Sequence, residues 1–206
     1  MISIFFLTLI SYLLGSISGS MIMGKFRNVD IRKLGSGNAG GTNAFRTQGF
    51  LFAFPVILID IGKGYIAAEY FNSLNFFDTT NLINANLIFG SAAVVGHCFP
   101  IFHNFKGGKG AGTALGVLIS ILPSTILPAL IIWILSLILT GFVGFSTILA
   151  AITVSIISFI KLPIIHNIQI MCLFISTFIV FMHRSNIIRM IKGEENQFKK
   201  IMLFKK

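Results

Sequence analysis

Long apolar stretches, separated by short polar and glycine-rich segments, dominate this sequence. The apolar stretches cover residues 2–23, 50–70, 82–102, 111–162 and 168–182. A helix needs about 20 apolar residues to cross the ~30 Å hydrocarbon core of a bilayer, and it satisfies its own backbone polar groups there. The pattern therefore predicts an all-α, polytopic membrane protein in which residues 1–206 form a single transmembrane helical domain.

The stretch at 111–162 is too long for one crossing. A single helix of that length would extend about 78 Å, more than twice the hydrocarbon core. Proline and glycine interrupt the pattern near residues 123–128 and 141–144, where we expect breaks. Three spans in this stretch give about seven helices in all. A five-helix arrangement, with part of the stretch merged or re-entrant, is the alternative.

The basic residues gather in three of the polar segments. Of the 16 Lys and Arg residues, 14 lie within 25–48, 103–110 and the tail from 183 onward, whereas 71–81 has none and contains Asp78. The positive-inside rule places those three segments in the cytoplasm, with the N-terminus outside and the C-terminus inside. This rule accounts for the net charge of +10 without a nucleic-acid partner. The hydrophobic fraction of 55% and the charged fraction of 11% also favour lipid as the solvent.

Two other features of the apolar stretches limit the possibilities. The first stretch lacks a basic n-region and a small-residue cleavage site, so we interpret it as a retained helix and not a signal peptide. Cys98 and Cys172 have no partner at metal-ligand spacing and are expected to be structural thiols. We expect no metal and no other cofactor.

The first basic segment, within 25–50, is rich in glycine and small polar residues. Glycine allows several backbone N–H groups to point at one anion, and the planar fork of Arg46 suits phosphate or carboxylate. Gly35, Gly37 and Gly40 match a dinucleotide fingerprint, but no strand precedes them and the match carries no weight. A flexible linker is the alternative. The candidate substrate-binding residues here are Gly37, Asn38, Thr42 and Asn43.

The second basic segment, within 96–113, places two lysines among glycines directly before a predicted helix. The N-terminus of a helix favours an anion, and Lys106 and Lys109 add positive charge. The segment is not a Walker A loop, because His103 stands where glycine is required and Gly110 follows the second lysine. Topogenic lysines with turn glycines are the alternative.

The third segment, within 183–200, follows the last predicted span. His183 and Asn186 are three residues apart and would share one face of a helix. Histidine can accept a proton near neutral pH, and an asparagine amide can donate to an oxyanion. An interfacial histidine followed by a polar helix end is the alternative.

Charged and titratable residues also occur inside or beside the predicted spans. Asp60 and Lys63, three residues apart in the second span, are expected to form a structural ion pair because isolated charges are costly in a membrane. His97 is a candidate for lining a cavity, and His166 for an external interfacial position.

Taken together, the three polar segments resemble the signature segments of the bacterial acyl-phosphate:glycerol-3-phosphate acyltransferase family of the PlsY type. The likeness is carried by GSGNAGGTNAFR at 35–46, GHCFPIFHNFKGGKG at 96–110 and HRSNIIRMIKGEE at 183–195. The DIGKG sequence at 60–64 adds to it, so the likeness extends over nearly the whole chain.

This resemblance implies transfer of an acyl group from acyl phosphate to the 1-hydroxyl of sn-glycerol 3-phosphate, which gives lysophosphatidate and phosphate. It implies catalytic roles for Ser36, Arg46, His183 and Asn186, glycerol-phosphate binding by Gly107, Gly108 and Gly110, and a structural role for Glu194. It also implies a multi-pass protein of the bacterial inner membrane with its active site facing the cytoplasm. The partners would be the two substrates, membrane lipid and, functionally, the enzyme that makes acyl phosphate.

One position departs from the family pattern. Family members carry a basic residue and a serine in the loop within 140–147, where this chain has Gly144, with Ser146 and Thr147 close by. The role of this loop is therefore open.

Acyl phosphate is already activated, so we expect direct attack by the glycerol hydroxyl, with His183 or a substrate phosphate oxygen as the proton acceptor. The histidine–aspartate pair of acyl-CoA-dependent acyltransferases is missing, because none of the four histidines has Asp five residues on. A membrane transporter for phosphorylated solutes is the alternative function, disfavoured by the lack of an evident internal repeat.

Overall fold

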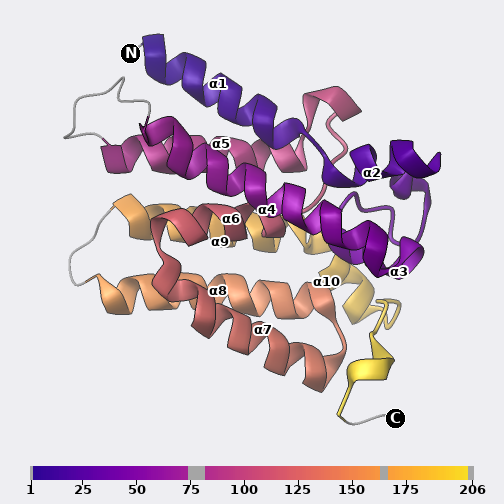
Figure 1. The fold of residues 1–206 in the computed structure, drawn as a ribbon. Helices are drawn as coiled ribbons and strands as arrows, with labels where there is room; N and C mark the ends of the chain where they lie inside the picture. Colours follow the sequence, from indigo (N-terminus) through magenta and orange to yellow (C-terminus); the bar gives the residue numbers. More distant parts are fainter. Residues whose placement is uncertain (1, 74–81, 163–166, 204–206) are drawn as a thin grey trace. The chain divides into compact units, whose positions relative to one another are not determined.

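The structure is a computed structural model that describes residues 2–73, 82–162 and 167–203. These residues form helices joined by turns and loops, without a strand, so the all-α prediction is confirmed (Figure 1). His166 and Asp78 lie outside the described residues.

The α-helices are α1 (Ile2–Ser16), α2 (Gly19–Arg27), α3 (Gly41–Gln48), α4 (Phe50–Ser73), α5 (Leu82–Cys98), α6 (Ala111–Ile121), α7 (Ile126–Thr140), α8 (Val143–Lys161), α9 (Asn167–Met182) and α10 (Arg184–Ile191). The short 3₁₀ turns are η1 (Ile31–Lys33), η3 (Ile101–His103), η4 (Pro123–Thr125) and η5 (Lys199–Ile201).

The chain divides into two compact units, Met1–Ile121 and Leu122–Lys206. The single domain expected from the sequence therefore stays a prediction, and the two units are described separately below.

Glycine contacts bring the long helices of the first unit together. In this unit α1 packs along α5, and α4 packs along both α5 and α6. A side chain at Gly15 of α1 would collide with the Ala93 backbone of α5, and one at Gly116 of α6 would collide with the Ile61 carbonyl of α4. Lipid provides no hydrophobic drive between helices, so close backbone packing at small residues is what holds them.

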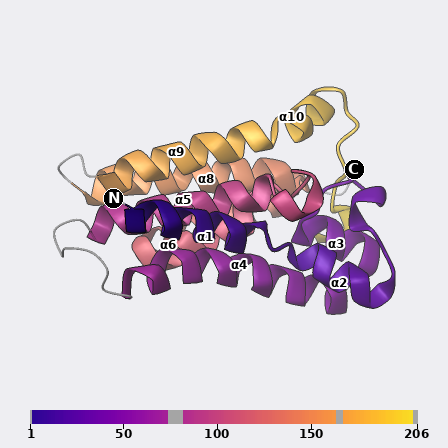
Figure 2. The ribbon, with the colours of Figure 1, turned by 90° about the horizontal axis from the view of Figure 1, so that it is seen from above.

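The short helices α2 and α3 gather at the start of α4 (Figures 1 and 2). The span predicted over 2–23 corresponds to the apolar segment Ile4–Arg27, which is long enough to cross a membrane and is divided into two helices. The helix stops at Ser16, and Ser18 caps a second helix by accepting a hydrogen bond from the backbone N–H of Met21, at 3.4 Å.

The second unit contains α7, α8 and α9, with α8 packed against both of the others. Its breaks fall where proline and glycine predicted them. Pro123 opens η4 ahead of α7, and Gly141 ends α7 in the left-handed conformation with φ of +72°. Helix α10 follows α9 at a bend of 49°.

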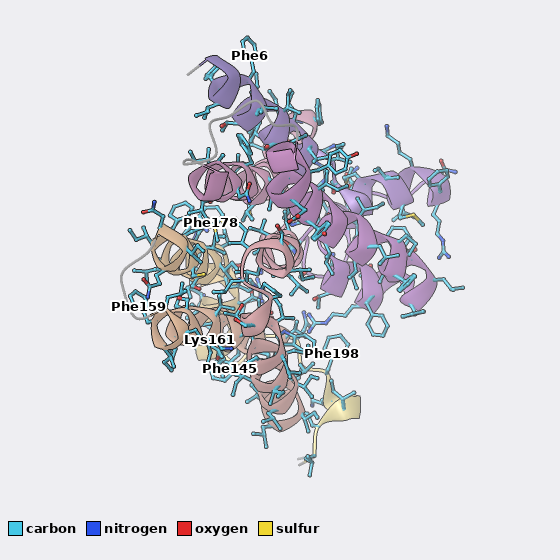
Figure 3. The ribbon with its side chains drawn as sticks, turned by 60° about the vertical axis from the view of Figure 1, so that its left-hand side comes forward. Phe6, Phe145, Phe159, Lys161, Phe178 and Phe198 are labelled. Carbon is cyan, nitrogen blue, oxygen red and sulfur yellow. The ribbon has the colours of Figure 1, made fainter. Side chains whose placement is uncertain are left out.

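Five helical segments within the described ranges are long and apolar enough to cross a membrane, and the bent pair of α9 and α10 would make six. The five segments are Ile4–Arg27, Phe50–Phe71, Ala85–His103, Pro123–Thr140 and Val143–Lys161. Helix α6 is apolar but has only 11 residues, about 16 Å of rise, which is shorter than the hydrocarbon core. Apolar side chains such as Phe6 and Phe159 project outward from their helices, as lipid-facing residues do (Figure 3). Seven crossings and the orientation of the termini stay predictions.

Candidate active site

The side chain of Asn43 organises the first polar loop, residues 28–40, which we call loop 1. Asn43 is 1% exposed, and its Nδ2 lies 2.9–3.2 Å from the carbonyl oxygens of Ile31, Leu34 and Asn38. Its Oδ1 accepts a hydrogen bond from the backbone N–H of Ser36, at 2.9 Å. Both ends of this amide therefore shape the loop. The sequence predicted substrate binding by Asn43, whereas its contacts are with the protein's own backbone.

The other candidates of the first segment lie around this anchor. Gly37 has φ of +73°, a conformation that favours glycine. Ser36 and Asn38 are half-buried in loop 1. Thr42 and Arg46 are half-buried and four residues apart in α3, so they share one face of that helix, as expected.

The side chain of Arg32 joins loop 1 to the second polar loop, residues 99–110, which we call loop 2. Within loop 1, Asp30 accepts hydrogen bonds from the guanidinium of Arg32 at 2.9 and 3.0 Å. The hydrogen bond and charge of Arg32 lower the pKa of Asp30 to about 2, so the carboxylate stays ionised at neutral pH. Arg32 Nη1 also donates to the carbonyl of His103 in loop 2, at 3.2 Å. The structure therefore brings the first two predicted segments together within the first unit.

The glycines of loop 2 fold back onto the end of α5. The N–H of Gly107 donates to the carbonyl of Cys98 at 3.2 Å, and the N–H of Gly108 donates to the carbonyl of His97 at 3.1 Å. A side chain at Gly107 would collide with the His97 carbonyl oxygen. The family resemblance implies glycerol-phosphate binding by these two glycines, whereas their N–H groups bond within the protein. The two glycines therefore allow loop 2 to approach α5 closely.

The remaining candidates of the second segment lie at the start of α6. Gly110, with φ of +85°, directly precedes this helix and its carbonyl accepts from Ala114 N at 2.8 Å. Lys106 is exposed and Lys109 is half-buried. This end of the first unit thus combines two ammonium groups with the N-terminus of a helix, an arrangement that favours anions.

A buried charged cluster lies next to loop 2. The predicted ion pair of Asp60 and Lys63 is present, with Nζ 3.0 Å from Oδ1, and the two residues are 3% and 4% exposed. The sequence did not connect His97 to this pair. Its Nδ1 lies 3.4 Å from the same Asp60 oxygen, and the residue is 5% exposed.

In the second unit, His183 and Asn186 lie where α9 bends into α10. His183 is 5% exposed, and its Nδ1 lies 2.8 Å from the carbonyl oxygen of Ile179. A carbonyl only accepts, so Nδ1 carries the proton and Nε2 is the basic nitrogen of the neutral ring. Asn186 is 7% exposed, and its backbone N–H donates to the His183 carbonyl at 2.9 Å.

The buried glutamate that supports this site is Glu195, and the expectation for Glu194 is corrected. Glu194 is exposed, whereas Glu195 is 8% exposed. The Nδ2 of Asn186 donates to Glu195 Oε1 at 2.8 Å, and Arg189 Nε donates to Oε2 at 2.6 Å. The two glutamates are adjacent in sequence, so nothing but their contacts distinguishes them.

Gly144, the position that departs from the family pattern, lies in the first turn of α8 against Asn186. A Cβ at Gly144 would lie 2.8 Å from the Asn186 Nδ2. The hydroxyls of Ser146 and Thr147 donate to carbonyls of their own helix, at 3.0 and 2.9 Å.

An apolar groove of about 740 Å³ also lies in the second unit, beside α10. Its lining comprises Leu139, Thr140, Phe142, Phe145, Ile148, Ile187, Met190, Ile191, Gln197 and Met202. Within the described ranges, no group of three or more His, Cys, Asp or Glu side chains could hold a metal ion.

Comparison with known proteins gives one consistent result. The model of the family described as glycerol-3-phosphate acyltransferase matches residues 5–193. The glycerol-3-phosphate acyltransferase of Chlorobaculum parvum is 39% identical over 91% of this chain and 93% of its own length, and that of Chlorobaculum tepidum is 38% identical over 96% and 97%. The crystal structure of PlsY, an integral membrane glycerol 3-phosphate acyltransferase, in its glycerol 3-phosphate form has a TM-score of 0.86 at 35% identity, covering 95% of this chain and 96% of that one. Its lysophosphatidic acid form has a TM-score of 0.84 at 34% identity, with 95% of each chain covered.

Proposed function

Because this chain belongs to the glycerol-3-phosphate acyltransferase family, we propose that it transfers an acyl group from acyl phosphate to the 1-hydroxyl of sn-glycerol 3-phosphate. The products are lysophosphatidate and inorganic phosphate, and the step is the first acylation of phospholipid synthesis. The reaction takes place at the cytoplasmic face of the bacterial inner membrane. The enzyme that makes acyl phosphate is then its functional partner.

The proposed acceptor is supported by the solved relative that holds glycerol 3-phosphate. Both substrates are anions, and the first unit supplies cations for them on loop 2 and α3. Arg46 provides a planar fork for a phosphate, whereas Lys106 and Lys109 act as point charges. The apolar groove beside α10 has a lining suited to the acyl chain.

The proposed donor follows from the chemistry that the described residues offer. Acyl phosphate is a mixed anhydride whose phosphate is a good leaving group, so a direct transfer requires only a base and an oxyanion donor. His183 and Asn186 provide these two functions. No histidine of the chain is paired with an aspartate in the spacing that acyl-CoA-dependent enzymes use.

The transfer is a single displacement at the acyl carbonyl carbon. The 1-hydroxyl oxygen of glycerol 3-phosphate attacks this carbon and forms the new ester C–O bond, while its proton passes to Nε2 of His183 or to a substrate phosphate oxygen. Asn186 donates to the developing oxyanion, a contribution of about 3 kcal/mol for one donor. The tetrahedral intermediate collapses as the bond to phosphate breaks, and phosphate leaves with the electron pair.

The observation that carries this proposal is the 2.8 Å contact of His183 Nδ1 with the Ile179 carbonyl oxygen. Because Ile179 fixes the proton on Nδ1, the ring presents its basic nitrogen in the form a general base requires. We expect His183→Ala to lower kcat by about 10²- to 10⁴-fold. The KM for glycerol 3-phosphate should change much less, because the substitution removes an interaction with the transferred proton and not with the phosphate.

The assay uses the full chain in detergent with acyl phosphate and glycerol 3-phosphate, and it measures phosphate release and lysophosphatidate. His166→Ala is the control, because this histidine is expected on the external side. A His183→Ala variant with unchanged kcat would exclude the ring as the base. If wild-type protein in vesicles moved phosphorylated solute without forming product, the function would be transport and not acyl transfer.

A further inference from the structure

The buried cluster of Asp60, Lys63 and His97 requires an explanation beyond folding. A charge in the membrane interior is costly, and a buried ion pair is often no more stable than a well-packed apolar pair of the same size. All three residues are at most 5% exposed; Asp60 and Lys63 lie in α4, and His97 lies at the end of α5, directly before loop 2. Each end of the cluster contacts a different backbone segment.

Lys63 reaches the break between α1 and α2. Its Nζ donates to the carbonyl of Ile17 at 2.7 Å and forms the ion pair with Asp60. This carbonyl lies between the two helices, so the ammonium satisfies a backbone acceptor there. One end of the cluster thereby fixes the point where α1 stops and α2 begins.

His97 reaches loop 2 at the other end of the cluster. Its ring faces Asp60 through Nδ1, and a side chain at Gly108 would collide with Nε2 of the same ring. The backbone N–H of Gly108 also donates to the His97 carbonyl. The ring is thus held between the Asp60 carboxylate and the Gly108 backbone, so the position of the carboxylate sets how closely loop 2 approaches α5.

We propose that Asp60, Lys63 and His97 are positioning residues that fix the Gly107–Gly108 part of loop 2 against α5, and so place the neighbouring Lys106 and Lys109 for the phosphate of glycerol 3-phosphate. The inference rests on the proposed function, since it takes loop 2 to bind that substrate. None of the three residues has to touch the substrate. Their effect passes through the imidazole ring to the loop backbone, and from there to the start of α6 at Ala111.

The test measures the Kd of glycerol 3-phosphate by calorimetry on the full chain in detergent, and the KM of acyl phosphate by phosphate release. We expect Asp60→Asn to weaken glycerol 3-phosphate binding by about ten-fold or more, with the acyl phosphate KM changed less than about two-fold. The matched control is Glu69→Gln. Glu69 is another α4 carboxylate and accepts a hydrogen bond from Ser120 of α6 at 2.6 Å, in a polar contact that does not involve loop 2. The control should bind glycerol 3-phosphate as the wild type does.

A second pair of variants keeps the inference testable if Asp60→Asn does not fold. Gly108→Ala pushes on the His97 ring, and His97→Ala removes the ring. Each should weaken binding, and the double variant should bind no more weakly than the worse single variant, because both changes release the same loop.

Three results would overturn the inference. An unchanged Kd in a folded Asp60→Asn variant is the first, and equal losses for both substrates, as a general loss of structure would produce, are the second. Multiplicative effects of His97→Ala and Gly108→Ala are the third. Failure of the proposed function gives a different result, because wild-type protein would then bind glycerol 3-phosphate and form no lysophosphatidate.

Discussion

The amide of Asn43 shows how a polar residue near a substrate site can serve the protein alone. Its nitrogen donates to three backbone carbonyls of loop 1, and its oxygen accepts a hydrogen bond from the Ser36 N–H. Gly107 and Gly108 act in a similar way, with their N–H groups bonded to the end of α5. At this scale, residues that shape a loop and residues that bind a ligand have the same chemical character, and their contacts alone separate them.

A residue-scale prediction concerns Gly144, which leaves room for the Asn186 amide. A branched side chain there would displace this amide, which lies 2.8 Å from the position of an added Cβ. We expect Gly144→Val to lower kcat by about 10- to 100-fold, part of the loss that removal of an oxyanion donor causes. The measurement is steady-state phosphate release.

Gly62→Val in α4 serves as the control, because a Cβ there would meet nothing within 4 Å. Both substitutions replace a helical glycine by valine, so they share the same change in helix propensity. Equal activity of the two variants would contradict a role for the Gly144 site in holding Asn186.

The sequence could predict the ion pair of Asp60 and Lys63, because three residues of separation bring two side chains together on any helix. It could not predict the contact of His97 with this pair, since 37 positions separate it from Asp60 and the contact depends on how α4 and α5 pack. The same reason explains the error at Glu194. Two adjacent glutamates at a helix end are equivalent until the turn after α10 buries one of them.

Among the helices, some ends are set by the local sequence and others by contacts with another helix. The ends near residues 122 and 141 were predictable, because proline lacks an N–H and glycine tolerates positive φ. The end at Ser16 was not predicted: no proline lies there, and the cap at Ser18 is a weaker signal inside a continuous apolar stretch. The backbone carbonyl of the next residue, Ile17, instead accepts a hydrogen bond from Lys63 of α4. The break therefore depends on tertiary contacts.

Glu195 links α10 to the segment that follows this helix. Glu195 joins Asn186 and Arg189 of α10, so its loss would leave a buried amide with one fewer partner. We expect Glu195→Gln to destabilise the protein by about 1–3 kcal/mol and to lower kcat. Thermal unfolding in detergent and steady-state assays would measure the two effects.

The adjacent Glu194→Gln substitution is the matched control. It removes the same charge from an exposed position of the same segment, so stability should change by less than about 0.5 kcal/mol. If the Glu194 variant were the more damaged of the two, the assignment of the supporting carboxylate would have to be reversed.

At the scale of the whole molecule, the distribution of charge carries the topological prediction. The three basic segments hold 14 of the 16 Lys and Arg residues and are expected on one side of the membrane. The chain is suited to a labelling test, because its two cysteines, Cys98 and Cys172, are 2% and 0% exposed and should react little.

For this test we expect cysteines placed at Lys33, Lys106 and Lys192 to react with a membrane-impermeant maleimide only after the cells are permeabilised. All three lysines are exposed in their own units. A cysteine at Asp78, in the gap without basic residues, should react in intact cells. Labelling of Lys192→Cys in intact cells would place the third segment on the opposite side, and one active site could not then include all three segments.

The glycine contacts between α1 and α5, and between α4 and α6, also bear on how the enzyme responds to its lipid surroundings. At these glycines the backbones of two helices are in direct contact. One helix cannot slide along the other without bringing a residue larger than glycine into that contact. The long helices of the first unit are therefore locked in axial register. We therefore expect the unit to tilt as a block when bilayer thickness varies with temperature or lipid supply, with a constant spacing between loop 1 and loop 2.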